Sequence, residues 1–240
     1  MRPLILLTRP LVASQRWAQR LDACGFDSLI APLLTIVPTG APRPSGRFHL
    51  VMMTSAHALR DESLPLEDLK DLPCFCVGQA TAEAARRRRF KNIHVGTSGG
   101  AALVSAITQS DTYTPNMFLL HLAGTEIAFE TEAAFDSHTI RTVPWVTYRA
   151  EASLDLPSEV VAALEQCKIA AVPVFSPRSA RILVELIAQR GLTSSCRSIL
   201  ALGLSQAVGA VLEDMPWNRL VIAAQPSSES MLAYIQRELP

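Results

Sequence analysis

Short, continuous apolar runs recur along the chain, and amphipathic stretches lie between them. Runs such as residues 4–7, 48–53 and 169–175 are typical of strands that are buried on both faces of a parallel sheet. Residues 13–24 carry apolar side chains on one side and polar ones on the other, which predicts a helix closed by Gly25. Strands that alternate with helices predict a parallel sheet with helices on both faces.

The same pattern predicts the remaining elements. We expect further strands at residues 26–31, 33–37, 73–77, 93–95, 117–122, 143–150, 199–202 and 220–223. We expect further helices after 54–56, over 78–89, 101–108 and 126–134, after the polar stretch 151–157, and from 176, 203 and 228 onward.

The two halves of the chain repeat one another. Thr54-Ser55-Ala56 corresponds to Phe175-Ser176-Pro177, and the stretch 78–82 corresponds to 203–207, an offset of about 125 residues. The second copy lacks the last strand–helix–strand unit of the first. Residues 4–37 have the size and pattern to supply that unit.

If residues 4–37 complete the second copy, the chain has two domains, and one of them is discontinuous. Residues 1–37 and 152–240 form the first α/β domain, and 41–145 form the second. The chain crosses between them at 38–40 and 146–151, so these crossings should be neighbours in a two-stranded β bridge. The expected fold is therefore two doubly wound, flavodoxin-like parallel-sheet domains with an active site in the cleft between them. Tyr148 would lie at the hinge and face that cleft.

Composition narrows the class of protein. The chain has 240 residues, 49% of them apolar, and a formal net charge of zero, which excludes a disordered chain and gives no overall attraction to a polyanion. The run 4–7 is too short for a signal peptide or a membrane span, and no later run reaches about 20 apolar residues. Five scattered cysteines favour buried, reduced thiols in the cytoplasm. The histidines do not cluster, so we expect no metal.

Candidate chemistry lies in the loops that lead from strands into helices. In α/β sheets ligands bind beyond the carboxyl ends of the strands, and free amides at helix N-termini bind carboxylate or phosphate. For any single loop, simple helix capping is the alternative explanation. Small or hydroxyl residues occupy nearly every such loop: Thr8, Thr54, Ser55, Gly78, Thr81, Ser98, Gly124, Thr125, Ser176, Gly203, Ser205, Ser227 and Ser228.

Three other site types find little support. The sequence contains neither GxxxxGK[ST] nor GxGxxG, which disfavours nucleotide binding. The basic run 86–91 is a candidate nucleic-acid patch, but a solvated helix C-terminus is the better interpretation. Ser55 and His57 do not form a nucleophilic pair of hydrolase type, because no GxSxG elbow is present.

Taken together, the two interleaved copies, the strand bearing Tyr148 and their order resemble the uroporphyrinogen-III synthase family over essentially the whole chain. The residues that carry the resemblance are Thr54-Ser55-Ala56, Gly78 with Ala80-Thr81-Ala82, Tyr148, Phe175-Ser176-Pro177 and Gly203 with Ala207. The resemblance implies a cofactor-independent lyase of haem and tetrapyrrole biosynthesis. That enzyme cyclises hydroxymethylbilane to uroporphyrinogen III, with loss of water and inversion of ring D.

The resemblance also implies roles for individual residues. Tyr148 matches the cleft tyrosine of the family and would protonate or hydrogen-bond the leaving hydroxyl. A phenol is a weak acid, with an ordinary pKa of about 10, so its share should be modest, on the order of 10²-fold. Thr54, Ser55, Thr81, Ser176 and Ser205 become substrate contacts, with Thr8, Gly78, Gly124 and Gly203 beside them. Charge and position make Arg9, Arg149 and Arg178 candidate carboxylate partners.

Two departures and two alternatives accompany this interpretation. Gln206 stands where the family commonly has a hydroxyl residue, and the stretch 123–126 lacks the Arg often found there. A non-catalytic two-domain module that closes on a small anionic ligand is the second hypothesis. A nucleic-acid protein that uses residues 86–91 is the third. We expect a cytoplasmic monomer that binds hydroxymethylbilane, with no nucleic-acid partner and no membrane association.

Overall fold

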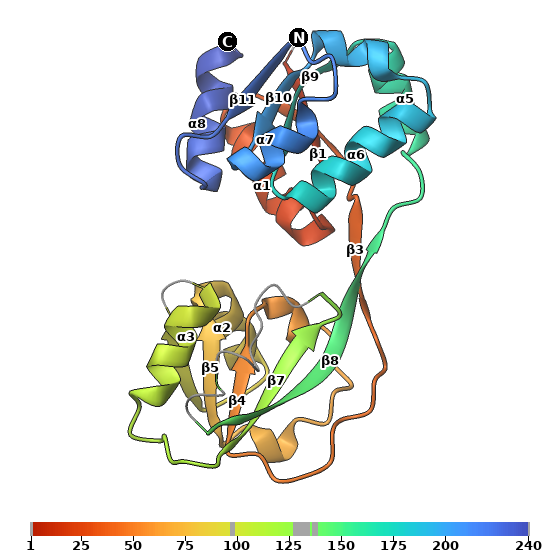
Figure 1. Cartoon of the computed structure of the whole chain (residues 1–240). Helices are drawn as coiled ribbons and strands as arrows, with labels where there is room; N and C mark the ends of the chain where they lie inside the picture. The colour runs from red at the N-terminus through yellow and green to blue at the C-terminus, as the bar shows by residue number, and fades with distance from the viewer. Residues whose placement is uncertain (1, 97–98, 127–134, 136–138, 240) are drawn as a thin grey trace. The chain divides into compact units, whose positions relative to one another are not determined.

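The computed structural model describes residues 2–96, 99–126, 135 and 139–239. Two compact units divide the chain (Figure 1): unit 1 comprises Met1–Thr35 and Glu151–Pro240, and unit 2 comprises Ile36–Ala150. The helix expected over 126–134 and the expected site residue Ser98 lie outside the described residues, apart from Glu126 at the start of that helix. Among the described helices, none combines the length and apolar character needed to cross a membrane.

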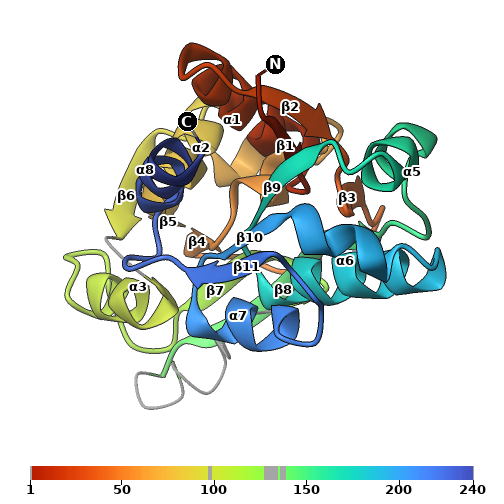
Figure 2. The ribbon, with the colours of Figure 1, turned by 90° about the horizontal axis from the view of Figure 1, so that it is seen from above.

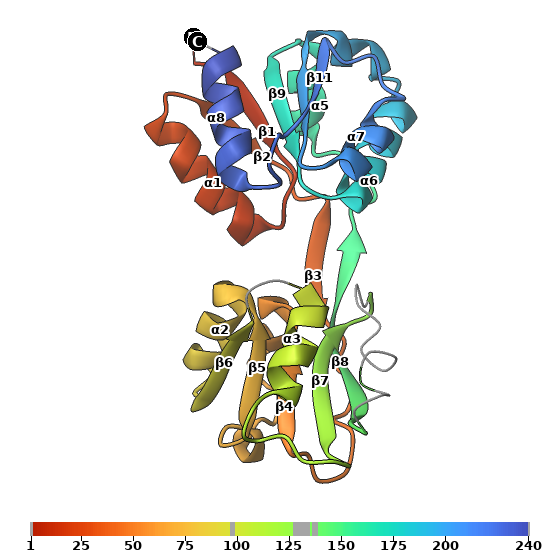
Figure 3. The same cartoon turned by 60° about the vertical axis from the view of Figure 1, so that its left-hand side comes forward.

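Unit 1 contains a parallel sheet of five described strands, in the order β2-β1-β9-β10-β11, which can be followed in Figure 2. Helices α1 and α8 cover one face of this sheet, and α5, α6 and α7 cover the other (Figure 3). The strands are β1 (Leu4–Leu7), β2 (Asp27–Ile30), β9 (Ile169–Val174), β10 (Leu200–Gly203) and β11 (Arg219–Ile222). The helices are α1 (Leu11–Ala23), α5 (Ser158–Glu165), α6 (Pro177–Gln189), α7 (Gln206–Leu212) and α8 (Ser228–Glu238), with a 3₁₀ helix η4 (Thr193–Ser198).

The continuous apolar character of β1 follows from its position inside this sheet. Ile5 and Leu7 pack into the core beneath α1 and α8, whereas Leu6 packs into the core beneath α5 to α7. Successive side chains of a strand point to opposite faces, so a strand covered on both sides needs apolar residues at every position.

Unit 2 contains a sheet of six described strands, in the order β3-β8-β7-β4-β5-β6 (Figure 3). The cores on its two faces again share one strand, because Val51 and Met53 of β4 face one core and Leu50 and Met52 the other. The strands are β3 (Leu34–Pro38), β4 (Leu50–Met53), β5 (Pro73–Val77), β6 (Asn92–Gly96), β7 (Phe118–Gly124) and β8 (Arg141–Ala152). The helices are α2 (Gly78–Arg87) and α3 (Gly99–Thr108), with 3₁₀ helices η1 (Ala56–Leu59) and η2 (Glu67–Leu69).

Strands β3 and β8 are the two segments by which the chain passes between the units. The amide of Thr39 donates to the carbonyl of Thr147 (3.2 Å), and the amide of Ser153 donates to the carbonyl of Leu33 (2.9 Å). The partner number falls as the chain number rises, so the two strands are antiparallel. The fold class expected from the sequence, two parallel α/β sheets joined by paired strands, is confirmed.

The two sheets have the same spatial arrangement of strands, but the chain enters that arrangement at a different strand in each unit. Unit 2 places β6-β5-β4-β7-β8 side by side, and unit 1 places β11-β10-β9-β1-β2 in the same arrangement. In unit 1 the segment β1–α1–β2 therefore fills the place that β7 to β8 fills in unit 2. When the five strands of unit 1 are numbered in chain order, their order across the sheet is 2-1-3-4-5, as in flavodoxin.

One expected element is wrong in kind. The segment after Thr54 and Ser55 was expected to form a helix, but the structure has only the short 3₁₀ helix η1 there, followed by turns and η2. Pro65, six residues beyond the end of η1, has no amide hydrogen to donate and limits how far a helix could run.

Candidate functional site

The strand order of unit 2 reverses between β4 and β7, and ligands of such sheets bind beyond the carboxyl ends of the strands at this point. Met53 of β4 is in register with Leu122 of β7, so the segments that follow the two strands start side by side. Thr54 and Ser55 follow β4, and Gly124 ends β7. The structure thus brings three predicted site residues to one sheet edge.

Tyr148 reaches this edge from β8, the neighbour of β7. It is in register with Gly124, after a shift in the pairing between Ala123 and Gly124. The amide of Thr125 donates to the carbonyl of Tyr148 (3.0 Å), so this amide is not available to a ligand. The half-buried Tyr148 ring lies at the end of the two switch-point strands.

The shift in pairing changes the direction in which Tyr148 points. Simple alternation would put Val143 and Trp145 on one face of β8 and Tyr148 on the other. All three side chains nevertheless pack with the same core. One extra residue in β8 is a β-bulge, and bulges commonly re-aim a side chain beside an active site.

His57 is a neighbour of Tyr148 that is not among the site residues predicted from the sequence. Its ring lies 5.8 Å from the Tyr148 ring, centroid to centroid, in an edge-on arrangement at 61°. Its amide donates to the side-chain oxygen of Ser55 (3.2 Å), which caps η1. Burial, and then the charge of Arg60, lower the pKa of His57, which favours the neutral imidazole.

The other predicted site residues of unit 2 differ in how far they are exposed to solvent. Gly78 begins α2 with a φ of +74°, a conformation that favours glycine. Thr81, in the first turns of α2, is buried with 3% of its surface exposed. Arg149 is exposed on β8, and Thr54 is half-buried.

Unit 1 has its own switch point, between β9 and β1. Thr8 and Arg9 follow β1, and Phe175 and Ser176 follow β9. Ser176 caps α6, because its side chain accepts a hydrogen bond from the amide of Ser179 (3.1 Å). Thr8 is buried, with 2% of its surface exposed.

Arg9 is a half-buried cation on an aromatic platform. Its guanidinium carbon lies 4.2 Å from the centroid of the Phe175 ring, which packs edge-on against Trp17 at 5.1 Å. Burial lowers the pKa of the Arg9 guanidinium, which remains charged at neutral pH. Within the described parts of the chain, its side chain forms no ion pair or hydrogen bond. Phe175 is a second site residue whose role is not predicted from the sequence.

The remaining predicted residues of unit 1 surround the same sheet edge. Arg178 is the second residue of α6 and is half-buried. Ser205 precedes α7 without a side-chain capping bond. Gly203 ends β10, where a Cβ would lie 3.2 Å from the backbone nitrogen of Gly209, so this glycine permits a close approach of α7.

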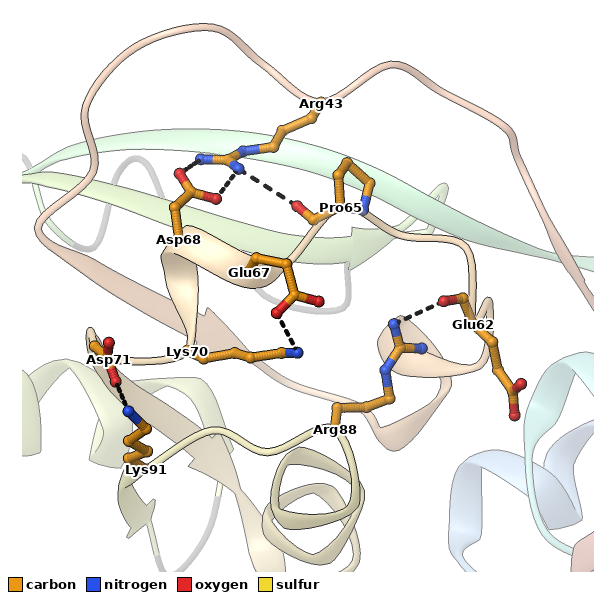
Figure 4. Close-up of polar contacts among 9 residues, drawn as sticks. All are labelled: Arg43, Glu62, Pro65, Glu67, Asp68, Lys70, Asp71, Arg88 and Lys91. Carbon is orange, nitrogen blue, oxygen red and sulfur yellow. Dashed lines mark hydrogen bonds and ion pairs between the residues drawn. The ribbon is translucent and has the colours of Figure 1, made fainter.

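Two residues of the basic run 86–91 make polar contacts within unit 2, and Figure 4 shows some of these contacts. Arg88 donates to the carbonyls of Leu59 (3.1 Å) and Asp61 (2.6 Å). It also donates to the carbonyl of Glu62 (3.1 Å), the contact that Figure 4 draws. Lys91 pairs with Asp71 (2.6 Å). Arg88 therefore anchors the end of α2 to the turn after η1 and is not a fully solvated charge.

No group of three or more His, Cys, Asp or Glu side chains could hold a metal ion within the residues that the structure describes. The five cysteines are all free, and the Sγ atoms of Cys74 and Cys76 lie 3.7 Å apart on one face of β5, as their spacing predicts.

Comparison with known families gives a match over most of the chain. A family model described as uroporphyrinogen-III synthase HemD matches residues 15–233. No curated protein sequence matches the chain at a significant level.

Solved structures with the same fold include one from Helicobacter pylori and one from Thermus thermophilus. The uroporphyrinogen-III synthetase of Helicobacter pylori aligns with a TM-score of 0.67 and 17% identity, covering 99% of each chain. A mutant uroporphyrinogen III synthase of Thermus thermophilus aligns with a TM-score of 0.52 and 16% identity, covering 98% of each chain. At these identities the structural likeness establishes the fold.

Proposed function

The chain belongs to the uroporphyrinogen-III synthase family, and we propose that it carries out the family reaction through the two switch-point edges described above. That reaction cyclises hydroxymethylbilane to uroporphyrinogen III in tetrapyrrole biosynthesis, with loss of water and inversion of ring D. The enzyme is a cofactor-independent lyase.

The observation that carries the proposed mechanism is the position of Tyr148. Its ring lies at the carboxyl end of the strands β4 and β7, where ligands of this class of sheet bind. Tyr148 donates a proton or a hydrogen bond to the hydroxyl group that leaves ring A. Water departs, and a cationic azafulvene remains. The substituted carbon of ring D then attacks this cation and gives a spiro intermediate, which rearranges to the inverted isomer.

Arg9 supplies a fixed positive charge for the substrate. Hydroxymethylbilane carries eight carboxylates, and a half-buried guanidinium that has lost hydration gains most from a ligand anion. Among the described residues, the side chain of Arg9 stacks on Phe175 and forms no hydrogen bond or ion pair, which leaves its donors available for a carboxylate. Arg178 and Arg149 are proposed as further carboxylate partners on charge and position.

Backbone amides and hydroxyls complete the proposed binding surface. The helices that follow β9, β10 and β5 begin beside Ser176, Ser205 and Gly78, and helix N-termini attract anions through free amides and the helix dipole. Ser55, Thr54, Gly203, Gly124, Thr8 and Thr81 remain predicted substrate contacts. Because Thr8 and Thr81 are buried, their contribution would act through the backbone or through packing.

We further propose that the protein works in the cytoplasm as a monomer that binds no nucleic acid. Five free cysteines suit a reducing compartment. Among the described residues the exposed large apolar side chains are limited to Leu11, Val12 and Leu154, too few for an extensive apolar interface. Arg88 and Lys91 are engaged within unit 2 and are therefore weak candidates for phosphate contacts.

An isomer assay tests the proposed function directly. Hydroxymethylbilane is generated in the reaction mixture, the protein is added, and the oxidised products are separated into uroporphyrin isomers I and III. The bilane closes spontaneously to isomer I, so predominant isomer III would establish catalysis with ring inversion. Isomer I alone, from folded protein, would contradict the proposal and favour a module that binds an anionic ligand without turnover.

A further inference from the structure

We propose that Gly124 and His57 are positioning residues that hold the ring of Tyr148 in one orientation. The inference rests on the proposed function for its catalytic consequence, but the arrangement itself involves only side chains and backbone of unit 2. Neither residue needs to touch the substrate. Their role is to fix where the phenol hydroxyl lies before the substrate arrives.

Gly124 gives the Tyr148 ring the space that it occupies. A Cβ atom at position 124 would lie 2.7 Å from Cζ, 2.8 Å from Cε2 and 3.0 Å from the hydroxyl oxygen of Tyr148. Side chains do not approach a Cβ this closely, so any larger residue would push the ring away. Because Gly124 has an ordinary φ, the reason for glycine here is the close approach and not the backbone conformation.

The backbone of β8 is tied down on both sides of Tyr148. The amide of Thr125 donates to the Tyr148 carbonyl (3.0 Å). The hydroxyl of Thr147, which is 3% exposed, donates to the carbonyl of Ala58 in η1 (2.9 Å). The second bond joins the bulged part of β8 to the turn that carries His57.

His57 then limits the ring from another direction. Its imidazole packs edge-on against the phenol, with the centroids 5.8 Å apart. The backbone of His57 is held by the bond from its amide to Ser55. Aromatic pairs favour edge-to-face or offset-stacked arrangements over others, so this contact restricts the positions open to the Tyr148 ring.

A fixed hydroxyl matters because proton transfer requires close geometry. The donor must come within hydrogen-bond reach of the leaving oxygen, and a displacement of about 1 Å can cost about 10²-fold in rate. The spontaneous ring closure competes with the enzyme, so a misplaced proton donor would also lower the proportion of isomer III.

The first test observes Tyr148 without relying on activity. The chain has three tyrosines, so labelling with 3-fluorotyrosine gives few ¹⁹F signals, and loss of one in Tyr148→Phe assigns it. We expect Gly124→Ala to shift this signal and leave the other two in place. Gly96→Ala is the matched control, since its Cβ would meet the flexible end of Leu103 at 2.9 Å at the end of β6. An unmoved Tyr148 signal in folded Gly124→Ala would overturn the proposal.

The second test is a double-mutant cycle in the isomer assay. Gly124→Ala and Tyr148→Phe should each lower kcat by about 10- to 100-fold, and the double variant should be no slower than the slower single variant. Additive losses would show that Gly124 acts independently of Tyr148 and would contradict the proposal. The ¹⁹F shift separates this failure from a failure of the proposed function, because it requires no turnover.

His57 provides a variant that does not crowd the strands. His57→Leu removes the ring and should lower kcat by about two- to tenfold, whereas His57→Phe keeps an edge-on partner and should retain most activity. The ¹⁹F signal of Tyr148 should broaden or shift in the leucine variant only. Equal behaviour of the two variants, or a change in KM alone, would remove His57 from the positioning role.

Discussion

The guanidinium of Arg9 lies 4.2 Å above the ring of Phe175, and the two residues follow the neighbouring strands β1 and β9. Residues 166 positions apart in the chain are thus joined at the switch point of unit 1 (175 − 9). The aromatic ring supports the cation without neutralising it, which keeps the charge available for an anionic ligand.

This relationship predicts that Arg9 contributes to substrate affinity. Arg9→Met should raise KM by about 10- to 100-fold, the equivalent of a lost charged hydrogen bond of about 1.5–3 kcal/mol, with a smaller effect on kcat. Steady-state kinetics with hydroxymethylbilane measure this. Arg16→Met, at an exposed position of α1, is the control and should behave like the unmodified protein. An unchanged KM in Arg9→Met would remove Arg9 from the binding site.

Tyr148→Phe should lower turnover by about one to two orders of magnitude and leave the fold intact. The phenol ring is retained, so the packing against Gly124 and His57 persists, while the hydroxyl is lost. Single-turnover rates and the isomer ratio measure the effect, with thermal unfolding as the check on folding. Kinetics identical to those of the unmodified protein would exclude Tyr148 from the mechanism.

Two serines at helix N-cap positions of unit 1 offer a matched pair for a stability test. Ser176 accepts a hydrogen bond from Ser179 at the start of α6, whereas Ser205 makes no side-chain capping bond at the start of α7. Ser176→Ala should therefore lower the free energy of unfolding by about 1 kcal/mol, and Ser205→Ala by less. Denaturant unfolding compares them. Both variants should keep most activity, because the backbone amides remain.

A buried histidine predicts that stability depends on pH. His121 of β7 is 1% exposed, and burial lowers its pKa to about 4. The unfolded chain, with a histidine pKa near 6.5, binds the proton more readily, so the free energy of unfolding falls as pH falls from about 6.5 to about 4. The expected loss from His121 alone is about 2 kcal/mol between pH 7.5 and 5.

The comparison of His121→Leu with the unmodified protein isolates this contribution. Urea unfolding at several pH values should give a shallower decline below pH 6.5 for the leucine variant, since that side chain does not titrate. Parallel curves for the two proteins would show that His121 keeps its ordinary pKa in the folded state.

Much of the architecture followed from the sequence because burial on two faces leaves a clear signal. The run 4–7 is apolar at every position and 48–53 at every position except His49, and the structure has a strand covered on both faces within each. The repeat of 78–82 at 203–207 likewise indicated that the two sheets are built alike. The element after Thr54 and Ser55 was misjudged because its capping signal is the same for a 3₁₀ turn as for an α-helix.

The contacts around Tyr148 could not be obtained in the same way. Alternation along β8 assigns Tyr148 to the face opposite Trp145, and only the bulge in β8 next to Gly124 brings both to one core. The bulge depends on the pairing of β7 with β8, which no local pattern encodes. His57 had one available signal, its place two residues after the capping Ser55, and Phe175 had its position at the end of an apolar run.

The sheet of unit 1 combines strands from the two ends of the chain, which has a consequence for synthesis on the ribosome. β1 emerges first, but its partner β9 begins at Ile169, and β10 and β11 follow only after residue 199. Unit 2 is continuous and can fold as soon as it has left the ribosome, whereas β1, α1 and β2 must wait until the second half of the chain is made. At about 5–20 residues per second, the 90 residues after Ala150 take about 5–20 s (240 − 150). During that interval the apolar side chains of the first segment lack the later residues that complete their cores, and any chaperone that helps this protein would be needed there.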